Sequence, residues 1–452
     1  MNRWTLHHGD CLAWLRTLPS ASVDAIVTDP PAGIAFMGKA WDHHKGGRAE
    51  WVAWLTEVMR ECLRILKPGG HALVWSLPRT EHWTACAVED AGFEIRDGVY
   101  HLCAQGWPKS LDVSKAIDAA AGAEREMIGV HRARRVANAF GGSWSETGGP
   151  LTAPATDDAK RWSGWGTALK PAVERWILAR KPLDGTVVAN VLAHGVGALN
   201  VDGCRVESGA RPLHGRTANE SDSSAYSTRG GSARVGETTL GRWPSNIVLS
   251  HAETCGDECD EACPVHALDE QSGARKSGQP TSGSAPVTKS AYGSGVARSL
   301  VGYTDEGGAS RFFPVFHPFG YFGKAKSANQ RGGVENKHPT VKNIDLMRWL
   351  VRLITPPGGL VVDAFAGSGT TGVAALLEGC RFAAAEADAD SYETARARLA
   401  AAELGETVIR GTSTRTAEPH PQPARRKPQT EMTEQVFDPQ LRLPGTQEGG
   451  DK

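Results

Sequence analysis

Three glycines near residue 370 have a spacing that is typical of a site for a nucleotide-like ligand. Gly367, Gly369 and Gly372 give the pattern G-x-G-x-x-G after an apolar run that ends at Asp363. A strand that enters a glycine turn before a helix lets a ligand approach the backbone, where free N–H groups face it. Glu386 ends a second apolar run, where a carboxylate suits a ribose diol. The spacing fits a dinucleotide or an S-adenosylmethionine site, and a turn needed only for packing is the structural alternative.

A second stretch, distant in the sequence, ends in a rigid turn. The run Asp24-Ala25-Ile26-Val27-Thr28 predicts a buried strand, and Asp29-Pro30-Pro31 follows it directly. Two consecutive prolines fix the backbone and remove two N–H donors, so carbonyl oxygens are left to accept hydrogen bonds. By itself this is a plain Asp-Pro turn.

Together the two stretches resemble the amino-methyltransferases of DNA. That family pairs an Asp/Ser/Asn-Pro-Pro-aromatic motif with a Phe-x-Gly-x-Gly motif, which stand here as Asp29-Pro30-Pro31-Ala32 and Phe365-Ala366-Gly367-Ser368-Gly369. The catalytic motif comes first and the cofactor motif last, which is the order of the family's beta-type permutation. The resemblance covers roughly residues 1–120 and 315–400. Three further segments match the family: Gly9-Asp10-Cys11, Leu66-Lys67-Pro68-Gly69-Gly70 and Lys337-His338-Pro339-Thr340.

The resemblance implies an enzyme that uses S-adenosylmethionine, bound across the carboxyl ends of parallel strands. In the family an acid at the position of Asp10 contacts the adenine of the cofactor, although Asp10 is also well suited to cap the following helix. The family's usual Lys-Pro pair is Lys342-Asn343 here, a mild departure. The cofactor-binding residues that the resemblance implies are Asp10, His338, Thr340, Asp363, Phe365, Gly367, Ser368, Gly369, Thr370, Thr371 and Glu386.

The Asp-Pro-Pro turn suits methyl transfer to an exocyclic amine, whose lone pair is delocalised into the ring of the base. The Asp29 carboxylate and the Pro30 carbonyl can accept the two amine hydrogens. They then stabilise the positive charge that develops as the nitrogen attacks the sulfonium methyl. Pro31 completes the rigid turn. Adenine N6 is the first choice of target because Asp begins the motif, whereas cytosine N4 enzymes more often begin with Ser.

Ala32 departs from the family, which has Tyr, Phe or Trp at this position to stack on the flipped base. We predict that Phe36 or Trp41, in the aromatic and basic loop that follows, replaces the lost ring and joins the catalytic residues. Alternatively, both rings anchor this loop in the core. A different substrate pocket, and a weak or inactive DNA-binding homologue, are the remaining interpretations of Ala32.

Three of the nine cysteines lie close together in the sequence. His251, Cys255, Cys259 and Cys263 follow one another at steps of four residues. Soft thiolates at this density suit a structural zinc ion, which would hold a glycine-rich segment that is poor in apolar residues. Free thiols on one helix face, or a disulfide, are the alternatives.

The predicted fold is α/β, with a Rossmann-like methyltransferase sheet that is circularly permuted and carries a large irregular insert. Within the insert we expect a helix at residues 172–179 and a strand at residues 187–192. The four predicted regions are the catalytic half at residues 1–121, the insert with target recognition and the metal cluster at 122–310, the cofactor-binding half at 311–404, and a disordered tail at 405–452.

The net charge of −1 at pH 7 means that DNA contacts must come from local clusters rather than from the overall charge. The sequence has no signal peptide and no apolar run of membrane-spanning length, which predicts a cytoplasmic protein with no membrane partner. Double-stranded DNA is the expected partner, and the sequence leaves open a homodimer and a separate restriction endonuclease. Three rival functions are a nicotinamide-dependent dehydrogenase, a non-catalytic DNA-binding protein, and an RNA or protein methyltransferase of the same fold.

Overall fold

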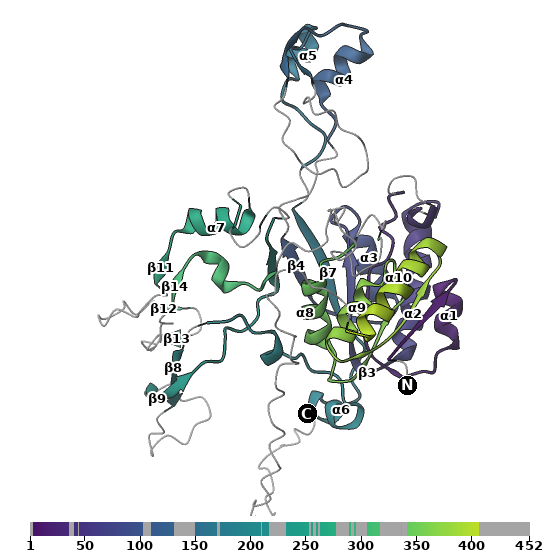
Figure 1. The fold of residues 1–452 in the computed structure, drawn as a ribbon, viewed down its shortest axis with the longest axis vertical. Coiled ribbons are helices and arrows are strands. Elements are labelled where there is room, and N and C mark those ends of the chain that lie inside the picture. Colours follow the sequence, from purple (N-terminus) through teal and green to yellow (C-terminus); the bar gives the residue numbers. More distant parts are fainter. Residues whose placement is uncertain are drawn as a thin grey trace, which may run out of the picture. The chain divides into compact units, whose positions relative to one another are not determined.

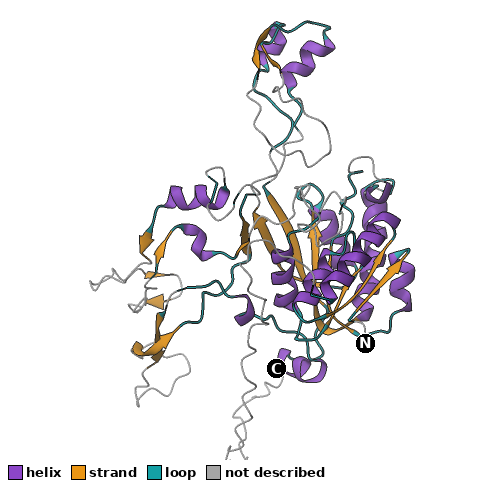
Figure 2. Cartoon of the chain, in the orientation of Figure 1, coloured by secondary structure: helices purple, strands orange, loops and turns teal. Residues whose placement is uncertain are grey.

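The computed structural model describes most of the chain up to residue 405. Figures 1 and 2 show the helices and strands within this part. The described residues are 3–35, 40–43, 45–102, 110–130, 150–169, 172–208, 210–216, 232–252, 255, 259–260, 263–276, 289–290, 293–294, 305–316, 336 and 341–405.

A nine-stranded sheet with the order β1-β17-β16-β2-β3-β7-β4-β10-β15 forms the centre of the molecule. Neighbouring strands run parallel, except that β7 is antiparallel to both β3 and β4. The strands are β1 (Trp4–His8), β2 (Val23–Thr28), β3 (Leu66–Ser76), β4 (Glu94–Leu102), β7 (Val173–Arg180), β10 (Ile247–Ser250), β15 (Val315–Phe316), β16 (Leu360–Asp363) and β17 (Arg381–Glu386).

Strands from the beginning and the end of the described chain complete this sheet together. β1 pairs with β17, and β2 pairs with β16, so the purple and yellow-green elements of Figure 1 lie side by side. Glu403, in the last helix, accepts hydrogen bonds from the Arg3 backbone N–H at 3.0 Å and from the Trp4 indole at 2.9 Å. The predicted α/β sheet that unites the two motif regions is confirmed, and the circular permutation stays a prediction.

Two apolar clusters cover the two faces of the sheet. Helices α1, α2 and α3 contribute to one cluster, and α8, α9 and α10 to the other. In β2, Ala25 and Val27 lie in the cluster with α8, and Ile26 lies in the opposite one, because successive strand side chains point to opposite faces. The helices are α1 (Cys11–Thr17), α2 (Arg48–Ile65), α3 (Glu81–Asp90), α4 (Val113–Ala120), α5 (Asp157–Arg161), α6 (Val187–His194), α7 (Pro264–Ser272), α8 (Ile344–Ile354), α9 (Thr370–Leu377) and α10 (Ala389–Glu403).

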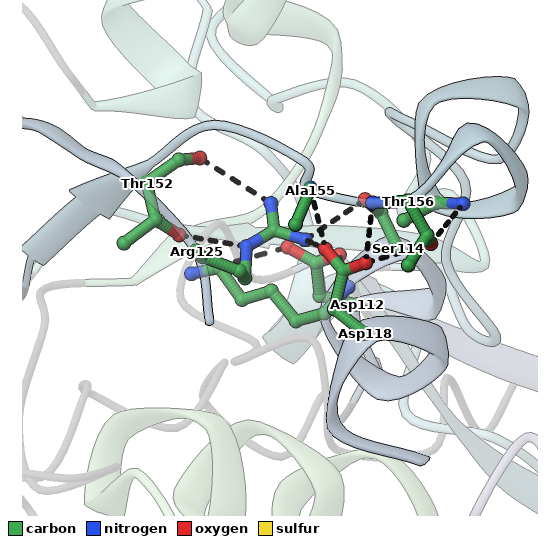
Figure 3. Close-up of polar contacts among 9 residues, drawn as sticks. Asp112, Ser114, Asp118, Arg125, Thr152, Ala155 and Thr156 are labelled. Atoms are coloured by element: carbon green, nitrogen blue, oxygen red, sulfur yellow. Dashed lines mark hydrogen bonds and ion pairs between the residues drawn. The ribbon is translucent and has the colours of Figure 1, made fainter. Parts of the chain in front are cut away.

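Residues 110–130 and 150–169 form a small unit that we call the α4–α5 unit, with the strands β5 (Met127–Val130) and β6 (Pro150–Thr152). Its centre is polar. Asp118 accepts hydrogen bonds from the backbone N–H groups of Ala155 and Thr156, at 3.0 Å each, and pairs with Arg125 (Figure 3). Burial by itself would raise the pKa of Asp118, but these hydrogen bonds hold that pKa at about 2.

The helix and the strand that we expected between residues 172 and 192 are exchanged in the structure, where β7 precedes α6. Residues 176–179 alternate between the two apolar clusters, so their period is two and they form a strand buried on both faces. The helix α6 depends on its ends. The Thr186 side chain accepts from Ala189 N–H at the start, and Gly195 ends the helix in the left-handed region.

The predicted insert, residues 122–310, is not wholly outside the sheet, because it supplies the strands β7 and β10. The described helices include none that is long and apolar enough to cross a membrane. The remaining elements are the short helices η2 (Ala40–Asp42), η3 (Asp202–Cys204) and η4 (Ala309–Phe312), and the paired strands β8 (Arg211–Arg216) with β9 (Ser232–Thr238), β11 (Arg275–Lys276) with β14 (Glu306–Gly307), and β12 (Lys289–Ser290) with β13 (Gly293–Ser294).

Candidate active site

The Asp-Pro-Pro turn and the glycine loop lie next to each other at the carboxyl edge of the sheet. β2 ends at Thr28, β16 ends at Asp363, and the two strands are parallel neighbours. The Thr28 hydroxyl donates to Asp363 Oδ1 at 2.7 Å, although the two residues are 335 positions apart in the sequence. The structure therefore brings the two sequence motifs together.

The three glycines of the loop have different structural roles. Gly367 (φ 53°) and Gly369 (φ 78°) adopt the left-handed conformation, which other residues rarely tolerate. Gly372 lies inside α9, where a Cβ atom would come within 2.4 Å of side-chain atoms of Leu399 and Phe382. The first two glycines shape the turn, and the third lets the helix pack closely against the sheet.

Arg398, in α10, holds the glycine loop in place and was missed by the sequence analysis. Its Nη1 donates to the Ser368 carbonyl at 2.5 Å and to the Thr370 hydroxyl at 3.1 Å. All three residues are buried, with Arg398 only 3% exposed. No sequence pattern distinguishes Arg398 from Arg396, an exposed arginine of the same helix. A cofactor contact by Ser368 or Thr370 stays a prediction.

Two predicted acidic residues lie at the ends of neighbouring strands. Glu386 Oε2 accepts the Gly367 N–H at 2.7 Å, and its Oε1 accepts the Asp388 N–H at 2.8 Å. Burial raises the pKa of Glu386, and these two hydrogen bonds oppose the rise. Asp10 accepts the Ala13 N–H at 2.8 Å, so it caps α1, as one of the two interpretations expected. Its side chain is exposed, and its contact with a cofactor stays a prediction.

Asp363 is a buried acid between the glycine loop and the Asp-Pro-Pro turn. Burial raises its pKa to about 6. Hydrogen bonds from the Thr371 and Thr28 hydroxyls and from the Phe365 N–H oppose this rise, while the negative charge of Asp29 adds to it. The two aspartates therefore influence each other electrostatically, which links the two motifs a second time.

Asp29 forms an ion pair with Lys342, whose Nζ lies 2.7 Å from Asp29 Oδ2. Burial raises the pKa of Asp29, Lys342 opposes the rise as a charge and as a hydrogen-bond donor, and the negative charges of Glu174 and Asp42 add to it. The side chain of Asp29 is 25% exposed and that of Lys342 only 7%. The side chain of Asp29 is thus partly accessible, whereas that of Lys342 lies within the protein.

Trp75 and Glu174 position this lysine, and the sequence analysis found neither. Lys342 Nζ lies 4.0 Å from the centroid of the Trp75 ring, and Trp75 Nε1 donates to Glu174 Oε2 at 2.9 Å. The sequence did not indicate Glu174 as a site residue, because the strand that contains it was predicted to be a helix. Asn343, which stands where the family has proline, caps α8 by accepting the Leu346 N–H at 3.0 Å.

The loop that follows the two prolines returns to the site at Asp42. Asp42 Oδ1 accepts the Gly33 N–H at 2.8 Å, and this aspartate is almost fully buried. Trp41, directly before it, is 37% exposed. Ala32 packs against the apolar cluster, and its carbonyl accepts the Thr80 hydroxyl at 2.9 Å. An exposed indole on this loop fits the stacking role of Trp41, which stays a prediction.

Three predicted site residues, Phe36, His338 and Thr340, lie outside the described residues. Phe365 packs against Trp54 of α2, with ring centroids 5.7 Å apart, and is partly buried in the apolar cluster. Its contact with a cofactor stays a prediction.

The predicted metal ligands converge in the structure. His251, Cys255, Cys259 and Cys263 each offer one ligand atom, and these atoms all lie within 4.8 Å of one another. His251 directly follows β10, and Cys263 directly precedes α7.

Comparison with protein families gives one match that includes both motifs. A family model described as DNA methylase matches residues 23–116 and 307–397. The first segment contains the Asp-Pro-Pro turn, and the second contains Lys342 and the glycine loop.

Similar proteins match parts of this chain. The type II methyltransferase M.BamHI of Bacillus amyloliquefaciens is 32% identical over 77 residues, which are 16% of this chain and 18% of that protein. The DNA adenine methyltransferase YhdJ of Escherichia coli is 44% identical over 68 residues, 15% and 22% of the two chains. The type II methyltransferase M.HindIII of Haemophilus influenzae is 24% identical over 231 residues, 43% and 64%. The chain thus spans about a fifth of the length of the first two relatives.

Among solved structures, the PvuII DNA methyltransferase (cytosine-N4-specific) aligns with 91% of this chain and 88% of its own, with a TM-score of 0.41 and 14% identity. The M1.HpyAVI complex aligns with 88% and 98%, with a TM-score of 0.35 and 15% identity. The sheet thus unites the two segments of this chain that match the DNA methylase family model.

Proposed function

We propose that this protein transfers a methyl group from S-adenosylmethionine to an exocyclic amine of a base in double-stranded DNA. The proposal depends above all on one observation: the Asp-Pro-Pro turn and the glycine loop meet where β2 and β16 end, joined by the Thr28–Asp363 hydrogen bond. The match of both motif regions to the DNA methylase family model supports it.

The glycine loop fits an S-adenosylmethionine molecule. Gly367 and Gly369 shape the turn, and α9 begins directly after them at Thr370, so its first N–H groups are the proposed contacts for the cofactor. Glu386, oriented by two backbone N–H groups, is the proposed acceptor for ribose hydroxyls. Asp10, at the start of α1, is the proposed contact for the adenine ring. When bound, the cofactor supplies an electrophilic methyl group on a sulfonium.

Asp29 and Pro30 are the proposed acceptors for the target amine. Two acceptors that take the two amine hydrogens draw the lone pair out of the ring and towards the methyl group. As the N–C bond forms and the S–C bond breaks, the nitrogen becomes positively charged and must lose a proton. A carboxylate whose pKa is raised by burial takes up a proton more readily, so Asp29 can receive it.

Lys342 keeps this carboxylate ready for the reaction. Its ammonium group opposes the effect of burial and favours the ionised form of Asp29. Lys342 contacts Oδ2, and a carboxylate has further lone pairs, so Asp29 can bind the lysine and the amine together.

Adenine N6 is the proposed target, because the catalytic motif begins with Asp, and cytosine N4 is the second candidate. Base-flipping enzymes hold the extruded base between aromatic or apolar side chains. Ala32 offers no ring, and the exposed Trp41 on the same loop is the proposed stacking partner.

The variant Asp29→Ala tests the proposed chemistry. We expect methyl transfer to DNA from labelled cofactor to fall by about 10²–10³-fold or more, because one of the two acceptors is lost. Cofactor affinity, measured by calorimetry, should stay nearly unchanged. Asp90→Ala, which removes an exposed aspartate at the end of α3, is the matched control. Equal loss of transfer and of cofactor binding in a folded Asp29→Ala protein would contradict the assigned role.

Mass spectrometry of digested DNA from expressing cells identifies the modified base. N6-methyladenine supports the proposed target, and N4-methylcytosine supports the second candidate. If neither base appears while the protein binds DNA, the inactive homologue is favoured. In that case Ala32→Tyr should restore methylation if the missing ring is the cause.

A further inference from the structure

We propose that His251, Cys255, Cys259 and Cys263 bind one structural zinc ion that joins the carboxyl end of β10 to the start of α7. This site lies outside the methyltransferase motifs, and its chemistry does not depend on the proposed function. Three thiolates and one imidazole form a donor set that favours zinc over the hard cations Mg²⁺ and Ca²⁺.

The distances within the cluster fit a tetrahedral ion. With Zn–S bonds of about 2.3 Å and a Zn–N bond of about 2.0 Å, tetrahedral geometry places two sulfurs about 3.8 Å apart and a sulfur and a nitrogen about 3.5 Å apart. In the structure, Cys255 Sγ and Cys259 Sγ are 3.7 Å apart. His251 Nδ1 lies 3.4 Å from Cys259 Sγ and 3.5 Å from Cys263 Sγ.

These distances do not fit the two alternatives. A disulfide needs sulfurs about 2.05 Å apart, and the described cysteines of the cluster are free. Thiols on one face of a helix would not enclose a common point with a histidine nitrogen. Moreover, His251 and Cys255 lie outside any helix in the structure, and Cys263 is only the cap residue of α7.

Backbone N–H groups point at two of the sulfurs, as is usual around metal thiolates. The Ala252 N–H donates to Cys263 Sγ at 3.3 Å, and the Asp260 N–H donates to Cys255 Sγ at 3.4 Å. Cys263 also stands at the N-terminus of the nine-residue helix α7, where the helix dipole favours a negative charge. These two hydrogen bonds favour the thiolate forms of Cys263 and Cys255, which a zinc ion requires.

The packing around the cluster shows why an ion is needed there. Among the described residues, the local apolar cluster has four buried members: Leu249, Ala252, Cys263 and Val265. Such a small core stabilises a segment weakly, and metal binding can supply the missing folding free energy. Helix α7 in turn holds η4, because Asp269 accepts hydrogen bonds from the Ser310 N–H at 2.7 Å and from its hydroxyl at 2.6 Å.

The zinc site would lie at the same edge of the sheet as the Asp-Pro-Pro turn. β7 is antiparallel to both of its neighbours, β3 and β4, so β3 and β4 run in the same direction. β2 is parallel to β3, and β10 is parallel to β4, so β2 and β10 also share this direction. His251 and Asp29 therefore both follow carboxyl ends of strands. Ser250, next to His251, bonds through its hydroxyl to buried His101 Nε2 at 2.7 Å.

Metal analysis of the full chain tests the proposal directly. The untagged protein is purified under reducing conditions with zinc in the growth medium, and its metal content is measured by mass spectrometry. We expect one zinc ion per chain in the wild type, and loss of that zinc in Cys259→Ser. Cys86→Ser, which alters a partly buried cysteine of α3, is the matched control and should keep its zinc.

A second measurement uses only the wild-type chain, in case the variant does not fold. Replacement of the metal by Co²⁺ should give the visible bands of a tetrahedral site together with thiolate-to-metal charge transfer. A wild-type protein that contains no zinc, or Co²⁺ bands of an octahedral site without thiolate charge transfer, would overturn the proposal. Retention of full zinc by folded Cys259→Ser would do so as well.

Discussion

The nine-stranded sheet and the α4–α5 unit are stabilised in opposite ways. The sheet lies between two large apolar clusters, and its inner strand β2 is buried at every residue. The α4–α5 unit is centred on Asp118 and its hydrogen bonds with Arg125, Ala155 and Thr156, and it exposes apolar side chains such as Met127, which is 68% exposed. Apolar packing joins residues that are hundreds of positions apart, whereas the polar network joins residues within one short region.

The proposed zinc site resembles the α4–α5 unit in the way it is stabilised. It too lies where few apolar side chains are buried, and it also depends on polar ligands from nearby positions. The comparison therefore predicts that changes in the sheet affect the whole molecule, and that changes in the outer segments stay local.

The largest expected effect is on catalysis at the sheet edge, from Lys342→Met. Burial raises the pKa of Asp29, and the ammonium group of Lys342 lowers it. Without this group the pKa of Asp29 should rise further. Because methyl transfer needs the ionised carboxylate, the acidic limb of the pH–rate profile should move to higher pH. Lys342→Arg, which keeps the charge, should move it far less. An unchanged profile in Lys342→Met would show that the ion pair does not tune the carboxylate.

The next largest effect is on the stability of the sheet, from Gly372→Val. The new Cβ would come within 2.4 Å of Leu399 and Phe382 atoms, and such overpacking costs about 1–3 kcal/mol of unfolding free energy. We expect a lower Tm for the main unfolding transition. Gly129→Val, in the strand β5 of the α4–α5 unit, is the matched control, since its Cβ would meet only ordinary contacts at 3.8 Å or more. Equal losses of Tm in both variants would contradict the expected difference between the sheet and the α4–α5 unit.

A smaller and local effect is expected from Asp118→Ala in the α4–α5 unit. The variant leaves Arg125 and two backbone N–H groups without their shared acceptor. Amide hydrogen exchange should accelerate in α4 and α5 and remain unchanged in β2 and β16. If protection in the sheet also falls, the unit is coupled to the sheet and does not unfold separately.

The smallest effect is a pH dependence confined to the same unit. The pKa of Asp118 in the folded chain, about 2, lies below the ordinary value of about 3.9. Its contribution to stability is therefore present above pH ~3.9 and is lost as the pH falls through the folded-state pKa. Exchange protection of α4 and α5 should decline between about pH 4 and pH 2 in the wild type. In Asp118→Asn this decline should be absent, and a decline of the same size there would exclude Asp118 as its cause.

The sequence was most informative where a residue type is demanded by local geometry. Gly367 and Gly369 were recognisable because few other residues adopt their left-handed backbone, and Asp29 because two prolines follow it. The group formed by His251 and the three cysteines was visible from its regular spacing. Each of these signals lies within a short stretch of chain, so no knowledge of distant contacts was required.

Other residues were beyond the reach of the sequence, because their roles arise from contacts between distant segments. Glu174 belongs to a strand that was predicted to be a helix. The side chains of this strand alternate between the two apolar clusters, and this alternation is visible only in the structure. Arg398 is distinguished from its exposed neighbours only by the loop against which it packs. Lys342 became a site residue only through its distance to Asp29.

By itself, the sequence determined the two motifs and the need for one sheet to unite them, because motifs record local backbone requirements. Only the tertiary structure decided which buried charges face each other and which strands complete the sheet. Those outcomes depend on burial and on distances between segments that are far apart along the chain, and neither quantity is encoded in any single stretch of residues.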